Sequence, residues 1–115
     1  MNSVNLIGRL VGEPELRVSA AGDQVCAMRV AVPRFHPAGM REPGVVFVEV
    51  TVAGLRGAEL VEQVVDGMRL GVSGRLDLDE WTAPDGESHT RYEVMADQLE
   101  VLDELPSGRA GGAAA

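Results

Sequence analysis

Alternation of apolar and polar residues is the main pattern along this chain, and it predicts β-strands. It is clearest at 45–53, where valine occupies every second position from Val46 to Val52. Successive side chains of a strand point to opposite faces, so these valines are predicted to form a buried face. Phe47 then falls on the opposite face, away from the core, and an aromatic ring at such a position indicates a binding or contact partner.

The same pattern predicts four further strands, at 4–11, 24–32, 68–81 and 88–102. Gly8, inside the first of them, indicates a bend or a close approach of another backbone segment. Gly12-Glu13-Pro14 is predicted to break that strand, and 15–18 forms a short extended continuation.

The second strand has an apolar face made of alternate residues of 26–32. Pro33 is predicted to end it, because proline cannot donate a hydrogen bond to the sheet. Residues 34–44 contain two prolines and two glycines, so we expect a long mobile loop. The only helix is predicted at 58–66, where apolar residues fall on one stripe and Gly67 supplies the stop.

Three strands, a helix and then a hairpin of two strands form the element order of a small Greek-key barrel. Pro84-Asp85-Gly86 is the turn signal between the last two strands. Five strands with one helix between the third and the fourth define the OB-fold. We therefore predict an all-β protein, a five-stranded OB-fold Greek-key barrel over residues 1–103. A short disordered tail is expected at 104–115.

The chain is acidic, with ten arginines, no lysine and 18 acidic residues, which gives a formal net charge of −8 over 115 residues. This length makes one domain, and the charge excludes a uniformly basic grip on nucleic acid. The charge is uneven, because residues 1–41 carry a net +2 and residues 42–103 a net −10. An anion-binding face should therefore draw on the N-terminal third and on isolated arginines elsewhere.

The single cysteine, Cys26, has no partner for an internal disulfide, which excludes a disulfide-stapled secreted scaffold. It lies in an apolar run and is predicted to be a small core residue. No stretch approaches the roughly 20 apolar residues that span a membrane, and the first residues show no charged and apolar leader. A soluble cytoplasmic protein without a membrane partner is expected.

No set of residues predicts catalysis or a cofactor. Asp77 and Asp79 share one strand face, yet no base and nucleophile converge on them, so an enzyme is not predicted. His36 and His89 lie far apart in the sequence and lack nearby ligand partners, so no metal site is expected.

Segments along most of the chain match one family in the right order. They are MNSVNLIGRL at 1–10, EPELR at 13–17, the strand at 22–32, FVEV at 47–50, GAEL at 57–60, GVSGRL at 71–76, and a closing hairpin with Trp81, Gly86 and 94–102. Over residues 1–102 the chain resembles the bacterial single-stranded DNA-binding protein (SSB) family. No single segment is unique to that family, but their order is specific.

The resemblance implies an OB-fold that assembles into a homotetramer or dimer, binds single-stranded DNA without sequence specificity, and serves replication, recombination or repair at the nucleoid in the cytoplasm. Aromatic rings stack on bases, at about 1–3 kcal/mol per base, and arginines contact phosphates. The stacking candidates are Phe35, Phe47, Trp81 and Tyr92. The phosphate-contact candidates are Arg9, Arg29, Arg34, Arg41, Arg56, Arg75 and Arg91.

Each candidate also has an interpretation without DNA. Phe47 fits barrel packing or a subunit contact, Trp81 fits a hydrophobic plug at the base of the hairpin, and Tyr92 fits a structural ring. Each arginine alone fits a solvated charge. Asp79, Glu80 and Thr82 flank Trp81 with polar side chains, which predicts that its ring is exposed.

The chain departs from the family at several positions. Glu49, Asp77, Asp79 and Glu80 stand where the family commonly has a cation, and Ala53 stands where it has an aromatic ring. A carboxylate in place of a cation repels phosphate, so these changes predict weaker binding or a shorter DNA path.

The alternative is an oligomeric OB-fold module that binds other proteins and has little affinity for DNA. Its acidic hairpin then serves a basic partner. The sequence also lacks the family's long tail with an acidic and apolar tip, so recruitment of replication or repair proteins through such a tail is not expected.

Overall fold

The computed structural model of the protein describes residues 1–18, 21–35 and 41–103, without the side chains of residues 41–43 and 55. The predicted tail at 104–115 lies outside the described residues, as do residues 36–40 of the predicted loop. The elements, in chain order, are β1 (Val4–Val18), β2 (Gln24–Phe35), β3 (Arg41–Ala53), α1 (Gly54–Gln63), β4 (Arg69–Thr82) and β5 (Ser88–Val101).

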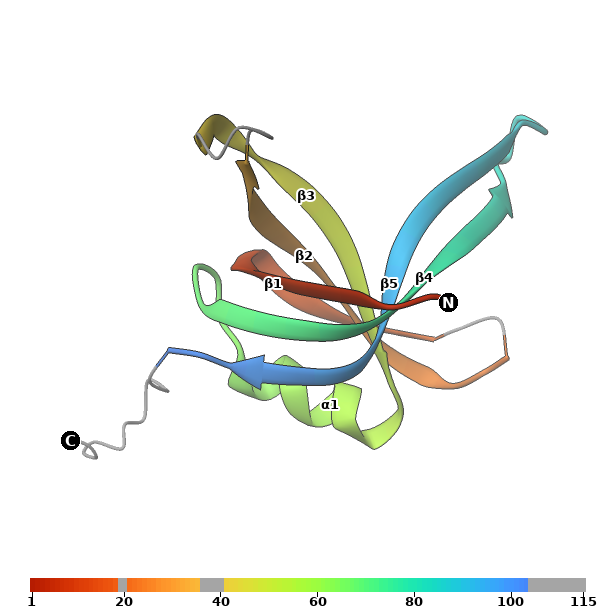
Figure 1. Cartoon of the computed structure of the whole chain (residues 1–115). Coiled ribbons are helices and arrows are strands. Elements are labelled where there is room, and N and C mark those ends of the chain that lie inside the picture. The colour runs from red at the N-terminus through yellow and green to blue at the C-terminus, as the bar shows by residue number, and fades with distance from the viewer. Residues whose placement is uncertain (19–20, 36–40, 104–115) are drawn as a thin grey trace.

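The five strands close into a barrel in the order β1-β2-β3-β5-β4 (Figure 1). Neighbouring strands are antiparallel except β3 and β5, which run parallel and pair at Val50 with Val94 and at Thr51 with Met95. α1 connects β3 to β4 and lies across one end of the barrel (Figure 1). The predicted OB-fold, with its helix between the third and fourth strands, is confirmed.

Two hairpins extend past the barrel at the end opposite α1, and Figure 1 shows them as diverging arms. We define the β2–β3 arm as residues 32–35 and 41–47, and the β4–β5 arm as residues 77–93. β1 pairs with β2 only as far as Ala31 and with β4 only as far as Gly74. Each arm is therefore a two-stranded ribbon without a sheet neighbour on either side, which leaves apolar side chains exposed on it.

The core follows the alternation of the sequence. Val50 and Val52 of β3 are buried and Val48 is half-buried, whereas Val46 lies on the β2–β3 arm and is 48% exposed. The predicted buried valine face is thus right inside the barrel and wrong at Val46, because the arm extends past the strands that enclose the core. The buried apolar residues are Leu10, Cys26, Met28, Val30, Val50, Val52, Leu60, Val64, Met68, Leu70, Val72, Val94 and Leu99.

Cys26 belongs to this core, as predicted, and its exposed fraction is 0%. Its thiol is free. Burial raises the pKa of the Cys26 thiol above its ordinary value, because a thiolate there would lose its hydration. The residue therefore acts as a small apolar side chain.

Two glycines allow backbone segments to approach closely. A Cβ atom at Gly8 would lie 2.5 Å from the carbonyl oxygen of Ala31, which confirms the predicted close approach. A Cβ atom at Gly57 of α1 would clash with the carbonyl oxygen of Val52 and lie 3.0 Å from the Cys26 nitrogen. Gly57 therefore lets α1 pack directly on β2 and β3.

Two predicted strand ends are wrong. β1 continues through Gly12-Glu13-Pro14, where its register with β2 shifts between Val11 and Glu15, so a bulge absorbs these residues. β2 continues past Pro33 to Phe35. β1 no longer neighbours β2 there, and a strand edge tolerates a residue without an N–H group.

The predicted loop at 34–44 is too long, because β3 already begins at Arg41.

Within residues 1–18, 21–35 and 41–103, no helix has the length and apolar character needed to cross a membrane.

The predicted helix is shifted. α1 ends at Gln63 and Val64 is already extended, so Gly67 is not its stop. Gly67 lies instead in the turn before β4, with a φ angle of 88° that suits glycine. At the other end, Gly54 and Gly57 obscure the helical pattern of the sequence. Packing against the barrel outweighs their low helix propensity.

Candidate nucleic-acid interface

The outer face of β2, β3, β5 and β4, opposite the core, carries two of the four aromatic residues. Phe47 on β3 alternates with the core valines and is 58% exposed, so its predicted orientation away from them is confirmed. Trp81 on β4 is 43% exposed, which confirms the predicted exposure of its ring. Each ring lies on one of the two arms.

This face is continuous across the β3–β5 junction. The Thr51 hydroxyl donates a hydrogen bond to Oε1 of Glu93 at 2.8 Å, and both side chains are partly buried. Thr51 lies on the same face of β3 as Phe47. Glu93 lies on the same face of β5 as His89, and His89 is the register partner of Trp81. One surface therefore connects the two exposed rings.

Phe47 has an arginine and a carboxylate beside it. The Arg29 guanidinium lies 5.8 Å from the centroid of the Phe47 ring, within the range of cation–π contact. The Arg29 Nε also donates a hydrogen bond to Oε2 of Glu49 at 2.8 Å. Arg29 and Glu49 are direct partners in the β2–β3 register. We call Phe47, Arg29 and Glu49 the β3 set.

Trp81 has equivalent neighbours. The Arg91 guanidinium lies 5.3 Å from the Trp81 ring, and its Nη2 lies 3.3 Å from Oδ2 of Asp79. Arg91 and Asp79 are direct partners in the β4–β5 register. We call Trp81, Arg91 and Asp79 the β4 set. The His89 ring also stacks with Trp81, at a centroid distance of 5.5 Å and an interplanar angle of 22°.

The other two aromatic rings lie elsewhere. Tyr92 is 70% exposed, but it directly follows Arg91 on β5, and successive side chains of a strand point to opposite faces. Tyr92 therefore lies on the opposite face of the β4–β5 arm, where it pairs with Leu78. Phe35, also 70% exposed, lines an open groove of about 1010 Å³ together with Ile7, Val45 and 14 further residues. The structure thus brings only Phe47 and Trp81 onto the shared outer face.

Three further predicted arginines are engaged away from the two rings. Arg9 Nη1 donates to the Gly67 carbonyl at 2.9 Å and lies 3.6 Å from an Asp103 oxygen. Arg56 Nη2 donates to the Leu99 carbonyl at 3.0 Å and ties α1 to β5. Arg75 Nη1 lies 3.3 Å from Oδ1 of Asp97.

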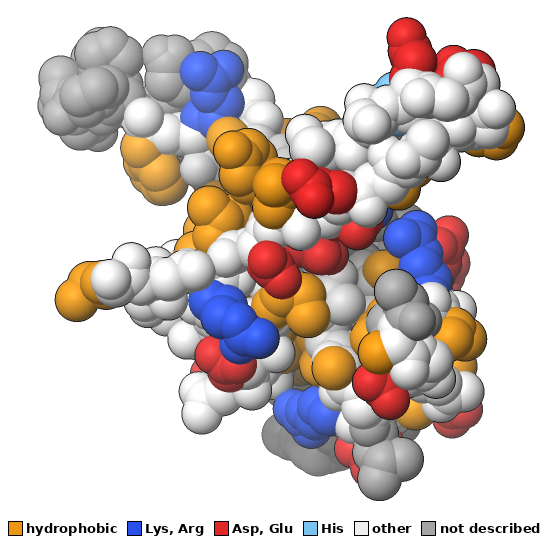
Figure 2. Space-filling view, turned by 90° about the vertical axis from the view of Figure 1, so that its right-hand side faces the viewer, with side chains coloured by type: hydrophobic (Ala, Val, Ile, Leu, Met, Phe, Trp, Pro, Cys, Tyr) orange, Lys and Arg blue, Asp and Glu red, His pale blue; other side chains and the backbone are white. Residues whose placement is uncertain are grey.

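The last two predicted arginines lie on the β2–β3 arm. Arg34 is exposed and makes no ion pair with any side chain that the structure describes. Arg41 begins β3, and its side chain lies outside the described part of the chain. Between the two upper projections of the molecule, Figure 2 shows acidic side chains rather than a continuous basic track.

The sequence did not lead us to expect His89 beside Trp81, although the predicted turn implies that the two residues pair. Trp81 and His89 lie four residues before and after Asp85, the centre of the predicted turn. A hairpin centred there pairs Trp81 with His89 and Asp79 with Arg91, which is the observed register. The Arg29–Glu49 pair had no such signal, because a long loop separates β2 from β3.

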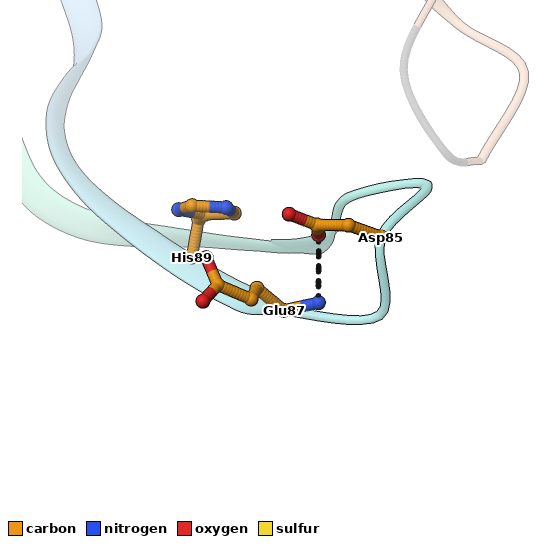
Figure 3. A group of neighbouring side chains, drawn as sticks. All are labelled: Asp85, Glu87 and His89. Carbon is orange, nitrogen blue, oxygen red and sulfur yellow. Dashed lines mark hydrogen bonds between the residues drawn. The ribbon is translucent and has the colours of Figure 1, made fainter.

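The tip of the β4–β5 arm groups three potential metal ligands (Figure 3). Ligand atoms of Asp85, Glu87 and His89 lie within 4.8 Å of one another, so the prediction that His89 lacks nearby ligand partners is wrong. The side chains of Asp85 and His89 have structural roles in the hairpin. An Asp85 oxygen accepts a hydrogen bond from the Glu87 backbone N–H at 2.9 Å, as in a turn, and His89 stacks on Trp81.

A closed five-stranded barrel with a helix between its third and fourth strands defines an OB-fold protein. The model of the single-strand binding protein family matches residues 1–102. The chain therefore belongs to this family.

The chain is similar to curated single-stranded DNA-binding proteins. That of Helicobacter hepaticus is 31% identical over 110 residues, which cover 93% of this chain and 64% of the relative. That of Clostridium tetani is 34% identical over 105 residues, covering 90% and 71%. A solved Plasmodium falciparum SSB in complex with single-stranded DNA matches with a TM-score of 0.74 and 22% identity, over 90% of this chain and 96% of that one. This structural likeness supports the fold.

Proposed function

We propose that this protein binds single-stranded DNA without sequence specificity, along the outer face that carries Phe47 and Trp81. The observation that carries the proposal is the pair of exposed rings, 58% and 43% exposed, on one continuous face of an SSB-family barrel. Stacking on such rings tolerates any base, because every base has a flat face. The same binding serves replication, recombination or repair, and no catalysis is proposed.

The paired charges on this face support a contact led by stacking. Arg29 and Arg91, beside the two rings, each have a carboxylate partner, so neither brings an unpaired positive charge to the DNA. Arg34 and Arg41 at the end of the β2–β3 arm are the remaining arginines for phosphate. The proposed contact is therefore short and weakly dependent on salt.

We also propose that the protein forms a homo-oligomer, a tetramer or a dimer. The supporting observation is the apolar lining of the groove beside β1 and β4, where Ile7 is 52% exposed, Phe35 70% and Val45 42%. Exposed apolar patches of this kind mark interaction surfaces. Sedimentation at several concentrations tests this, and a single species with the monomer mass of 12.2 kDa at every concentration would contradict it.

The experiment for DNA binding is a titration with oligo-dT at two salt concentrations, followed by the fluorescence of Trp81, the only tryptophan. We expect quenching as bases stack on the ring. Absence of quenching, together with absence of any anisotropy change of a labelled oligo-dT at low salt, would contradict the proposal. That result favours the alternative of an OB-fold module that binds proteins.

A further inference from the structure

The β3 set and the β4 set repeat the same arrangement on two separate arms. In each, an aromatic residue and a carboxylate lie two positions apart on one strand, so they share a face. In each, an arginine on the neighbouring strand is the register partner of the carboxylate and contacts the ring. Both carboxylates, Glu49 and Asp79, thus hold an arginine that lies beside a proposed stacking ring.

A carboxylate and a phosphate compete for the same guanidinium. The carboxylate is planar and the phosphate tetrahedral, but both are oxyanions that accept hydrogen bonds from N–H groups. The forked guanidinium of arginine fits either of them. The Arg29 Nε that bonds Glu49 at 2.8 Å is therefore not available to a phosphate until this hydrogen bond breaks. Glu13, Glu15 and Arg17 line one depression of about 250 Å³ with Arg29 and Glu49, and the Arg17 guanidinium pairs with Glu15 there at 2.8 Å.

The hold on Arg91 is looser. Its Nη2 lies 3.3 Å from Asp79, and its Nε has no hydrogen-bond partner among the described residues. Asp77 and Glu93 share the face and are register partners of each other, so they add negative charge beside Arg91. Both pairs are exposed enough to exchange partners, because Arg29 and Arg91 side chains are 56% and 39% exposed. Exposed pairs add little to folding stability.

We propose that Glu49 and Asp79 act as internal competitors for DNA phosphate. Each occupies an N–H donor of an arginine beside a stacking ring, and a phosphate of single-stranded DNA pairs fully with that arginine by displacing the carboxylate. This inference rests on the proposed function and adds to it which residues set the affinity. Of the two, Glu49 has the larger effect, because its hydrogen bond to arginine is the shorter.

The test compares Glu49→Gln, Asp79→Asn and Arg29→Gln with the unmodified protein, using the anisotropy of a labelled oligo-dT between 50 and 200 mM salt. One additional phosphate contact strengthens binding to a single strand by about three- to eightfold over this range and steepens the slope of log K against log salt by about 0.7. We expect this change for Glu49→Gln and a smaller one for Asp79→Asn.

Glu62→Gln is the matched control, because it removes the same charge from an exposed position of α1, at the opposite end of the barrel from the arms (Figure 1). We expect it to strengthen binding less than Glu49→Gln does. An equal gain from Glu62→Gln would show that only the overall charge matters and would overturn the proposal.

A double-mutant cycle separates competition from simple repulsion. If Glu49 acts by holding Arg29, the gain from Glu49→Gln is larger when Arg29 is present than in the Arg29→Gln protein. Equal gains in both backgrounds would overturn the proposal while leaving the proposed function intact. Failure of the unmodified protein and of every variant to bind at 50 mM salt would refute the proposed function itself, and this inference with it.

Discussion

Glu49 faces Arg29 across the β2–β3 pair, and its Oε2 accepts a hydrogen bond from the Arg29 Nε at 2.8 Å. Asp79 and Arg91 repeat this relationship on the other arm. Glu49 and Asp79 are therefore not isolated charges, since each pairs with an arginine on the same surface. The proposed DNA contact then depends on its rings more than on its charges.

Replacement of Trp81 by alanine is expected to weaken binding of oligo-dT by about 1–3 kcal/mol, because the stacking surface for one base is lost. Phe47→Ala is expected to act in the same direction. The measurement is the anisotropy of a labelled oligo-dT, which does not depend on the fluorescence of Trp81.

Tyr92→Ala is the control for this prediction. Tyr92 is 70% exposed, more than Trp81 at 43%, but it lies on the face opposite Trp81. Its removal is expected to change binding less than the removal of Trp81. Equal losses from both variants would show that the DNA does not follow the outer face.

Replacement of Gly8 by alanine is expected to destabilise the fold by about 1–3 kcal/mol, the usual effect of overpacking. The added Cβ would lie 2.5 Å from the Ala31 carbonyl oxygen and 2.7 Å from a Val30 methyl group. Urea denaturation at fixed protein concentration measures the change. In Gly71→Ala, on neighbouring β4, the new Cβ would meet only Leu102 at 3.6 Å, so little loss is expected. Equal losses would contradict the steric explanation.

The sequence predicted the fold and the outward direction of the Phe47 and Trp81 rings. The alternation of apolar and polar residues predicts the strands and the side of each strand that faces the core. The valine face of β3 places Phe47 on the other side, and the close packing at Gly8 follows from a glycine inside a strand. Strand ends were harder to predict. Pro33 looks like a terminator, yet it is tolerated where β2 has lost β1 as its neighbour.

The ion pairs of the candidate site show a different limit. The Asp79–Arg91 pair follows from a turn centred at Asp85, because a short hairpin determines its own register. The Arg29–Glu49 pair does not, since the loop between β2 and β3 leaves several registers open. From the sequence alone, Glu49 is expected to be a charge that repels DNA. Its arginine partner becomes visible only with the observed β2–β3 register.

The Cys26 thiol is expected to resist thiol reagents in the folded protein at pH 8. It is fully buried, and its raised pKa keeps it protonated. Because the folded pKa lies above the unfolded one, the stability that this group contributes is present below the ordinary thiol pKa and is lost as the pH rises through the folded value. Labelling with a chromogenic disulfide, with and without 8 M urea, measures the reactivity. Rapid, complete labelling without urea would contradict it.

Thr51→Val is expected to destabilise the barrel by about 0.5–1.5 kcal/mol, since it removes the hydrogen bond from the Thr51 hydroxyl to Glu93 and leaves the partly buried carboxylate without it. Thermal unfolding measures the loss. Thr90→Val, an exposed position on the same strand as Glu93, is the matched control and is expected to change stability little. A larger loss at Thr90 would contradict the role of Thr51.

The parallel pairing of β3 with β5 closes the barrel at only two register positions, whereas every other neighbouring pair of described strands shares at least six. We therefore expect the native barrel to open first at this seam, and amide protons there to exchange with solvent sooner than those of the long hairpins. Each arm leaves the barrel from one side of the seam. We expect a strand of DNA that binds both arms to hold the two sides of this seam together and to slow its opening.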